Sequence, residues 1–424
     1  MPEMSSNDWA QMITSIVIVL AMGGLFTNAA GFLILLERKV CSWVQDRIGP
    51  NRVGPLGLLQ PLADGIKLFV KEEFMPRGAD KALFILAPGL AIIPAVIAFA
   101  VIPWGGVLEL SSLPFLNLTG TVKIIGADVN IGIIYLVAAA SLGVYGVSIG
   151  GWASNNKYSF IGGMRAAAQM ISYEIPMGLT LLAVILTAGT VYGMDIVNQQ
   201  LAHGWFILHL PIAAVIFYSC MLAEGNRAPF DLAEAEQELV GGWHTEYSSM
   251  KWAMFFLGEY VHMIVGSAFF AVLFLGGWSI SPFGLWPDLP AQGGILLILL
   301  QAGIVLGKTF MLIFLTMMVR WTLPRFRFDQ LMRLAWEGMI PASMLVLLAT
   351  SFMVFMGWQS WMWAGSLATF VLIWLAYPHL PKQANPNHRV PLIGSRFCPV
   401  DERESVSAPS HPIALDDAAI PGSR

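Results

Sequence analysis

Acidic side chains crowd the stretch from Glu224 to Glu246, which reads EGNRAPFDLAEAEQELVGGWHTE. It holds six carboxylates, and Arg227 is the only Lys or Arg between them. Neighbouring carboxylates repel one another, so some of them keep a proton at a higher pH than an isolated Asp or Glu. The stretch is therefore a candidate for holding and passing protons near neutral pH. The simpler alternative is an acidic face that water solvates.

The spacing of these acids predicts a short helix that begins near Asp231. Asp231, Glu234 and Glu238 are three and then four residues apart, so a helix would place them on one face, and Glu236 would project from another. Gly241 and Gly242 are typical of a helix end. Glu246 would follow on the next turn or loop.

Further charged residues stand in or next to strongly apolar runs. Ionisable groups at such positions are costly in a membrane and are functional candidates by default. The candidates for proton or charge coupling outside the acidic stretch are Glu37, Glu174, Glu259 and Lys308. Lys308 lies about 11 residues from either end of its run, roughly 16 Å, which is too deep to reach water easily. We therefore expect Lys308 to have a buried carboxylate partner.

The composition indicates a membrane protein with several spans. Hydrophobic residues make up 56% of the 424 residues, charged residues only 12%, and the mean hydropathy is +0.68, whereas soluble domains are about a quarter charged. A net charge of −4 argues against a nucleic-acid partner, which needs a concentrated basic surface. The three cysteines match no metal-ligand spacing, and we expect no metal site and no haem or iron–sulfur cluster in this chain.

The apolar runs predict an all-α fold of about nine transmembrane helices, since a span needs about 20 residues. The runs lie near 12–36, 82–103, 131–150, 170–191, 205–223, 252–275, 296–319, 339–357 and 361–378. With the N-terminus outside, 21 of the 23 Lys and Arg fall on inside segments, which predicts a cytoplasmic C-terminus. We expect one membrane domain over 1–378 and a polar tail over 379–424 that is disordered or bound to a partner. The outside segment 104–130 has the composition of a short β-hairpin.

The first inside loop combines tight turns with an amphipathic helix. Gly49-Pro50 and Gly54-Pro55 predict turns that present Arg47 from rigid backbone. After them, Leu58, Leu62, Ile66 and Phe69 recur at helical spacing, while Asp64, Lys67 and Lys71 fall on other faces. We expect a helix that lies on the membrane surface. An ordinary surface helix stays an alternative from the pattern alone.

A basic loop follows the seventh apolar run and reads RWTLPRFRFD, with Arg320, Arg325 and Arg327. It is opposite in sign to the acidic stretch at 231–246. The positive-inside bias explains its charge by itself, and a pairing between the two inside loops is the more specific hypothesis.

Several long motifs resemble the quinone-site membrane subunits of respiratory complex I, the NADH:quinone oxidoreductase, in which this component is the H subunit. They are ERKV, QDRIGPNRVGP, QPLADGIKLFVKEE, the segment around Glu174, EGNRAPFDLAEAEQELVGG with TEYS, and RWTLPRFRFDQLM. The resemblance runs from about residue 10 to 357 in the same order. The segment 104–130 and everything after 357 depart from the usual bacterial pattern of eight spans.

The resemblance implies a role for each candidate residue. A chamber between the first span, the sixth span and the amphipathic helix would admit quinone, with Arg38, Arg47, Asp64 and Lys67 at its polar end. The residues that would couple quinone reduction to proton translocation are Glu37, Glu174, Asp231, Glu234, Glu236, Glu238, Glu246, Glu259 and Lys308. Arg320, Arg325 and Arg327 would dock the peripheral arm. No residue of this chain is expected to be catalytic in itself.

The resemblance also implies the surroundings of the chain. Quinone is the expected substrate, and flavin and iron–sulfur clusters are expected on partner subunits. Those partners are peripheral-arm subunits and antiporter-like membrane subunits, in a bacterial inner membrane. A related hydrogenase subunit and a standalone cation/proton antiporter stay open as alternatives. An antiporter should show inverted repeats, and none is visible in this sequence.

Overall fold

The computed structural model describes residues 6–112, 120–233, 240–284 and 288–376. The chain divides into two units, Met1–Ile373 and Trp374–Arg424. Only residues 374–376 of the second unit are described. The predicted tail over 379–424 lies outside the described residues.

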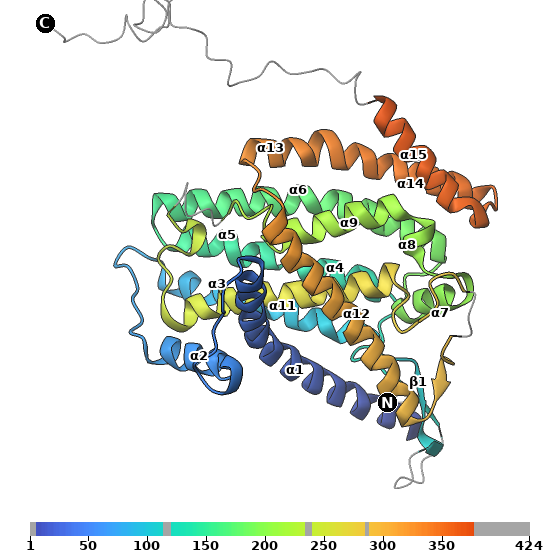
Figure 1. Cartoon of the computed structure of the whole chain (residues 1–424), viewed down its shortest axis with the longest axis horizontal. Helices are drawn as coiled ribbons and strands as arrows, with labels where there is room; N and C mark the ends of the chain where they lie inside the picture. Colours follow the sequence, from blue (N-terminus) through green and yellow to red (C-terminus); the bar gives the residue numbers. More distant parts are fainter. Residues whose placement is uncertain (1–5, 113–119, 234–239, 285–287, 377–424) are drawn as a thin grey trace, which may run out of the picture. The chain divides into compact units, whose positions relative to one another are not determined.

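Helices dominate the described chain and strands are few and short, which confirms the predicted all-α membrane fold (Figure 1). The helices are α1 (Ser6–Val44), α2 (Gln60–Val70), α3 (Lys81–Ala98), α4 (Gly132–Ser141), α5 (Gly143–Ala153), α6 (Lys157–Ala188), α7 (Gly193–His203), α8 (Phe206–His209), α9 (Pro211–Glu224), α11 (Ser249–Phe274), α12 (Ile295–Thr322), α13 (Phe328–Arg333), α14 (Ile340–Phe355) and α15 (Met362–Ala376). A π-helical segment, Leu334–Met339, joins α13 to α14.

Seven helical stretches of the described residues are long and apolar enough to cross a membrane. They correspond to seven of the nine predicted spans. The fifth and ninth spans coincide with the shorter helices α9 and α15, of 14 and 15 residues. The count of nine therefore stays a prediction.

The predicted hairpin in 104–130 is present and has a third strand. β1 (Val107–Glu109) pairs antiparallel with β2 (Thr121–Lys123), and β3 (Gln292–Gly293) pairs parallel with β1. Gln301 of α12 anchors this small sheet, because its side chain accepts from the Gly106 N–H at 2.7 Å and donates to the Pro290 carbonyl at 2.8 Å.

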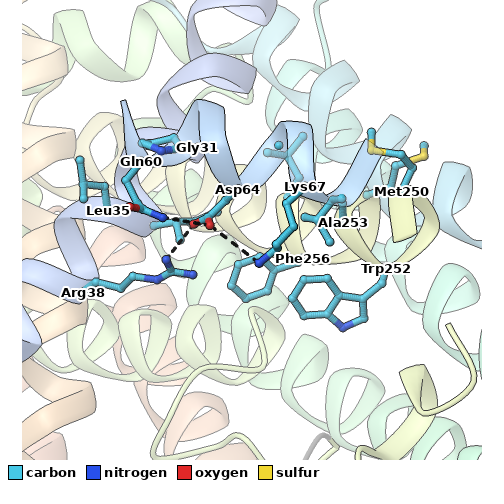
Figure 2. Close-up of a pocket in the computed structure, with 16 residues that line it drawn as sticks. Gly31, Leu35, Arg38, Gln60, Asp64, Lys67, Met250, Trp252, Ala253 and Phe256 are labelled. Carbon is cyan, nitrogen blue, oxygen red and sulfur yellow. Dashed lines mark hydrogen bonds and ion pairs between the residues drawn. The ribbon is translucent and has the colours of Figure 1, made fainter. Parts of the chain in front are cut away.

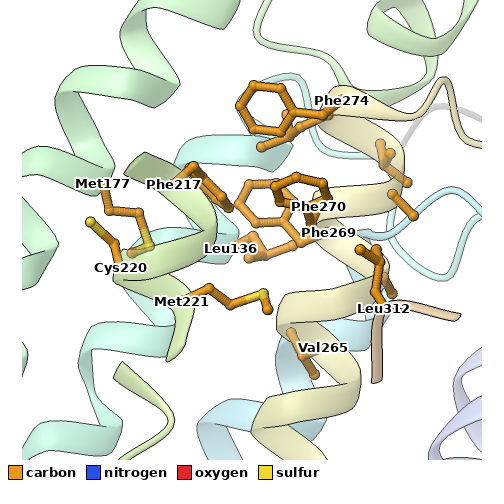
Figure 3. Close-up of a cluster of buried hydrophobic side chains, with 14 of the residues drawn as sticks. Leu136, Met177, Phe217, Cys220, Met221, Val265, Phe269, Phe270, Phe274 and Leu312 are labelled. Carbon is orange, nitrogen blue, oxygen red and sulfur yellow. The ribbon is translucent and has the colours of Figure 1, made fainter. Parts of the chain in front are cut away.

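Large side chains of α9 and α11 fill the centre of the bundle (Figure 3). The Phe217 ring lies 5.7 Å from Phe269 and 5.5 Å from Phe274 between ring centres. In a bilayer the lipid is as apolar as these side chains, so close packing rather than escape from water holds the helices together. α5 and α6 approach most closely at Gly151, where an added Cβ would lie 2.6 Å from the Ser159 carbonyl. This packing fixes α11, which carries one wall of the site.

Candidate functional site

A cavity of about 310 Å³ lies between α1, α2 and α11 (Figure 2). Its lining residues are Gly31, Ile34, Leu35 and Arg38 of α1, Gln60, Pro61, Asp64, Gly65, Lys67 and Leu68 of α2, and Met250, Trp252, Ala253, Met254, Phe256 and Leu257 of α11. These are the three elements between which the chamber was predicted. Most of the wall is apolar, and the Trp252 and Phe256 rings stack 5.0 Å apart.

The charged groups of the cavity meet at Asp64 (Figure 2). Its carboxylate accepts from Arg38 Nη1 at 2.8 Å and from Gln60 Nε2 at 3.1 Å, and Lys67 Nζ lies 3.8 Å away. Three of the four predicted chamber residues, Arg38, Asp64 and Lys67, therefore line one cavity. Arg47 does not line it and is exposed beyond the end of α1, where its guanidinium donates to the Gln45 side chain at 2.8 Å.

α2 is the predicted amphipathic helix. Its polar residue Asp64 faces α1, while Leu62, Ile66 and Phe69 are 62%, 57% and 75% exposed. In a membrane protein such an outer face suits lipid at the interface.

Glu37 is buried and binds two arginines and a tyrosine at once. Arg227 Nη1 donates to its carboxylate at 3.1 and 3.3 Å, the Tyr260 hydroxyl donates at 2.7 Å, and Arg320 Nη1 forms a third contact. These partners come from the loop after α9, from α11 and from α12, and Glu37 itself lies on α1. Glu37 thus joins α1 to the loop after α9, to α11 and to α12, and it precedes the cavity residue Arg38.

Arg227 connects this cluster to a second acid. Its guanidinium lies 3.9 Å from Glu259 Oε2 and 4.2 Å from the centre of the Tyr260 ring. Burial alone would lower the pKa of Arg227, but Tyr260, Glu37 and Glu259 together raise it. Arg227 therefore stays charged in the interior. In the sequence, Arg227 stood out only as the one Lys or Arg of the acidic stretch. Nothing in the sequence indicated that Tyr260 would contact it.

Asp231 forms the direct link between the acidic and basic loops. Its Oδ2 accepts from Arg325 Nη2 at 2.9 Å, whereas its Oδ1 is buried without a hydrogen-bond partner among the described residues. Burial raises the pKa of Asp231 to about 6, although Arg325 opposes the rise. Asp231 can therefore exchange a proton close to neutral pH. Glu234, Glu236 and Glu238, and the helix predicted for them, lie outside the described residues.

Two small, separate cavities of about 30 Å³ each lie among α3, α4, α5, α6, α9 and α11. Glu224 and His262 border both of them, and Glu259 borders one. About 30 Å³ is room for one water molecule. Glu174 lies within electrostatic reach of Glu224, and its buried Oε1 has no partner within the part of the chain that the structure describes. Glu224 was not among the predicted coupling residues, although it opens the acidic stretch.

Glu246 binds a different part of the structure from the acids described above. It accepts a hydrogen bond from Asn156 Nδ2 at 2.5 Å, next to the start of α6. Arg327 is exposed at the start of α13, where its N–H donates to the Gln330 side chain at 3.2 Å.

The expected carboxylate does not bind Lys308 directly, although Asp288 lies within electrostatic reach of the ammonium group. Lys308 Nζ donates to the carbonyls of Leu275, Gly277 and Ser279 at 2.5, 2.8 and 2.5 Å, and it lies 4.3 Å from the centre of the Trp205 ring. These carbonyls belong to the C-cap of α11 and to the loop that follows it, and a sequence does not show which backbone groups lie near a side chain. No carboxylate of the described residues lies within ion-pair distance of Lys308.

Comparison with known proteins matches nearly all of this structure. A family model described as NADH dehydrogenase matches residues 15–351. An NADH-quinone oxidoreductase H subunit of Cytophaga hutchinsonii is 46% identical over 342 residues, which cover 80% of this chain and 96% of that protein. The chain belongs to the NADH dehydrogenase family. The H subunit of the same enzyme from Rhodospirillum rubrum is 48% identical over 349 residues, 81% of this chain and 94% of that protein.

The matched region contains every residue of the cavity and of the Glu37 cluster. α15 lies beyond it. The chain is therefore a multi-pass membrane member of the family that carries an additional helix after the shared region. Among the described residues, no three His, Cys, Asp or Glu side chains gather as metal ligands would.

Proposed function

We propose that this chain is the membrane subunit of a proton-translocating NADH:quinone oxidoreductase that admits quinone through the cavity between α1, α2 and α11. The cavity supports this proposal most directly. Its apolar wall suits an isoprenoid tail, and Arg38, Asp64 and Lys67 form a polar rim for the headgroup. The names of the relatives, each an H subunit of NADH-quinone oxidoreductase, support the enzyme class.

The same arrangement supports charge coupling. Two electrons give a quinone headgroup negative charge until two protons neutralise it, so a headgroup beside Arg38 would change the charge next to Glu37 during reduction. Glu37 shares Arg227 with Glu259, and Asp231 pairs with Arg325 of the basic loop. Charge interactions are strong where water is excluded. We propose that protons move through Glu37, Glu259, Glu224, Glu174 and Asp231, together with Glu234, Glu236, Glu238 and Glu246.

The remaining parts of the proposal concern the assembly. Flavin and iron–sulfur clusters belong to partner subunits, and quinone is the substrate that reaches them from the bilayer. Arg320, Arg325 and Arg327 face a peripheral arm on the cytoplasmic side, and antiporter-like subunits adjoin the bundle. The N-terminus is outside and the C-terminus cytoplasmic, as the distribution of basic residues favours.

A substitution that fills the cavity with a larger side chain tests this proposal. Ala253→Trp places an indole at a position where the wall presents only a methyl group. In membranes with the assembled complex, we expect NADH:quinone reduction to fall about tenfold or more, while NADH oxidation by ferricyanide stays near wild type. Ala202→Trp, on an exposed position of α7, is the matched control. Equal loss of both activities in Ala253→Trp, or loss of neither, would contradict the proposal.

The subunits that copurify separate this proposal from its alternatives. A hydrogenase partner would bring nickel, and a standalone antiporter would transport cations without any redox subunit. NADH oxidation by the purified assembly supports the oxidoreductase.

A further inference from the structure

Ser249 is the first residue of α11, and its backbone conformation is unusual for a serine. Its φ is +55°, in the left-handed region that favours glycine, and the residue is 5% exposed. A buried serine in this conformation persists only where its surroundings hold it. The hydroxyl group is the feature that glycine would lack.

The hydroxyl of Ser249 reaches the end of α2, about 180 residues earlier in the chain. Its Oγ lies 2.9 Å from the Leu68 carbonyl and 2.9 Å from the Lys71 carbonyl. The last carbonyls of a helix have no partner within the helix. A hydroxyl has one hydrogen, so it satisfies one of these carbonyls at a time. Ser249 thus caps the C-terminal end of α2 from another helix.

Two neighbouring contacts hold the same junction. The Phe74 N–H donates to Ser248 Oγ at 3.2 Å, and Lys251 Nζ forms an ion pair with Glu73. At its other end, α2 is held to α1 by Arg38 and Asp64. No residue of α2 is buried. Polar links therefore hold α2 in place more than packing does.

The junction adjoins the cavity directly. Leu68, whose carbonyl accepts from Ser249, and Met250, which follows Ser249, both line the cavity wall. A movement of the end of α2 away from α11 would widen this side of the cavity, and the polar rim at Asp64 would stay attached to α1.

We infer that Ser249 is a positioning residue that holds α2 against α11 and thereby makes the cavity selective for the long apolar tail of quinone. This inference rests on the proposed function. A long tail contacts the whole wall between α2 and α11, whereas a quinone with one isoprene unit leaves the Leu68 end of the wall empty. Loosening α2 therefore weakens the binding of the long-tail substrate selectively.

The test is Ser249→Gly in the complete, assembled complex. Glycine adopts a φ of +55° without strain, so the variant removes the hydroxyl and spares the fold. We expect hydrogen exchange of the amides in 66–74 to accelerate at least about threefold. We expect the KM for a quinone with a long isoprenoid tail to rise about fivefold, the effect of one lost hydrogen bond. The kcat for that quinone, and the KM for a quinone with one isoprene unit, should stay within about twofold.

Ser219→Ala is the matched control, because within the described part of the chain the half-buried Ser219 hydroxyl donates to the Val215 carbonyl of its own helix. Unchanged exchange in 66–74 would overturn the inference whatever the kinetics. Faster exchange with an unchanged KM for the long-tail quinone, or an equal rise for both quinones, would overturn the selective role. Failure of the proposed function is distinct, because Ala253→Trp would then leave quinone reduction intact.

Discussion

Glu37 is the residue at which the buried charges of the site converge. One carboxylate with 5% of its residue surface exposed accepts from Arg227, Arg320 and Tyr260. Taking these groups out of water is costly, and the cost is offset only while all partners are present. The neighbouring residue Arg38 belongs to the cavity. Glu37 therefore links the cavity to the buried network within one turn of α1.

Glu37→Gln should destabilise the subunit and slow quinone reduction together. The amide is the same size but leaves two guanidinium groups without their shared charge, which costs about 3–5 kcal/mol for a buried pair. The measurement is the thermal midpoint of the complex in membranes, read with quinone reductase activity. Glu337→Gln is the control, because the Glu337 side chain is 55% exposed and lies 3.9 Å from Arg333. Equal, small effects of both variants would contradict the special role of Glu37.

Asp231 should give the stability of the subunit a pH dependence. Its pKa is raised from 3.8 to about 6, because burial outweighs the attraction of Arg325. The folded protein therefore holds this proton more tightly than the unfolded chain does. The stabilisation, about 3 kcal/mol, is fully present below pH 3.8 and is lost as the pH rises through about 6.

Asp231→Asn tests this dependence, because an amide does not titrate. Between about pH 4.5 and 6.5, the thermal midpoint of the wild type should fall more with rising pH than that of the variant. Asp329→Asn, in the first turn of α13, serves as the control. Parallel pH profiles in wild type and Asp231→Asn would mean that Asp231 does not titrate in this range.

Residue types and predicted topology identified candidate site residues, but they did not predict which of these side chains contact one another. The motif resemblance grouped Arg38, Asp64 and Lys67 with Arg47, and Arg47 does not line the cavity. Glu37, Arg227, Tyr260 and Arg320 come together from positions as much as 283 residues apart. No local pattern carries that information, so Tyr260 and the central place of Arg227 emerged only from the fold.

Among the secondary-structure elements, α2 shows what hydrophobic periodicity can predict. The alternation of apolar and polar residues predicted both α2 and its outward apolar face, since a helix repeats every 3.6 residues. The strand β3 was not predicted, because two residues give no periodic signal and their partner in β1 lies about 185 residues earlier. The carbonyl partners of Lys308 could not be predicted either. Every residue has a backbone carbonyl, so residue type does not show which carbonyls lie near the side chain.

Lys308→Met should loosen the C-terminal end of α11. The variant keeps the length of the side chain and leaves the carbonyls of Leu275, Gly277 and Ser279 without their charged donor. A hydrogen bond from a charged group contributes about 1.5–3 kcal/mol. We expect faster hydrogen exchange in 270–279 and a lower thermal midpoint.

Lys308→Arg separates the charge from the geometry, because it keeps a cation in the same place. It should recover part of the lost protection in 270–279. Unchanged exchange in Lys308→Met would show that the carbonyls find other donors, and the helix end would not depend on Lys308.

At the scale of the whole molecule, the inside loops are the surface on which a peripheral arm would dock. Arg325 already pairs with Asp231, whereas Arg327 is exposed. Arg327→Glu should therefore weaken docking without breaking a contact inside the subunit. Native gels should show less full-size complex with NADH-oxidising activity, and Arg333→Glu, on the same short helix, is the comparison. Full-size complex at the wild-type level would remove Arg327 from the docking surface.

Some features of the whole molecule could be predicted from the sequence, and others could not. The class, the order of the spans and the three walls of the cavity followed from composition, hydrophobic runs and the motif resemblance. The volume of the cavity and its closeness to Glu37 along α1 depend on how α1, α2 and α11 pack. Packing is a property of the assembled bundle and not of any one segment.

Photoaffinity labelling tests the central claim, that the cavity holds the tail of quinone, most directly. The probe is a long-tail quinone with a photoreactive group on the tail, bound to the assembled complex and mapped by mass spectrometry. We expect labels in 31–38, 60–68 and 250–257 that excess unmodified quinone abolishes and that Ala253→Trp weakens. Labels confined to other segments, or labels in these segments that excess quinone does not displace, would contradict it.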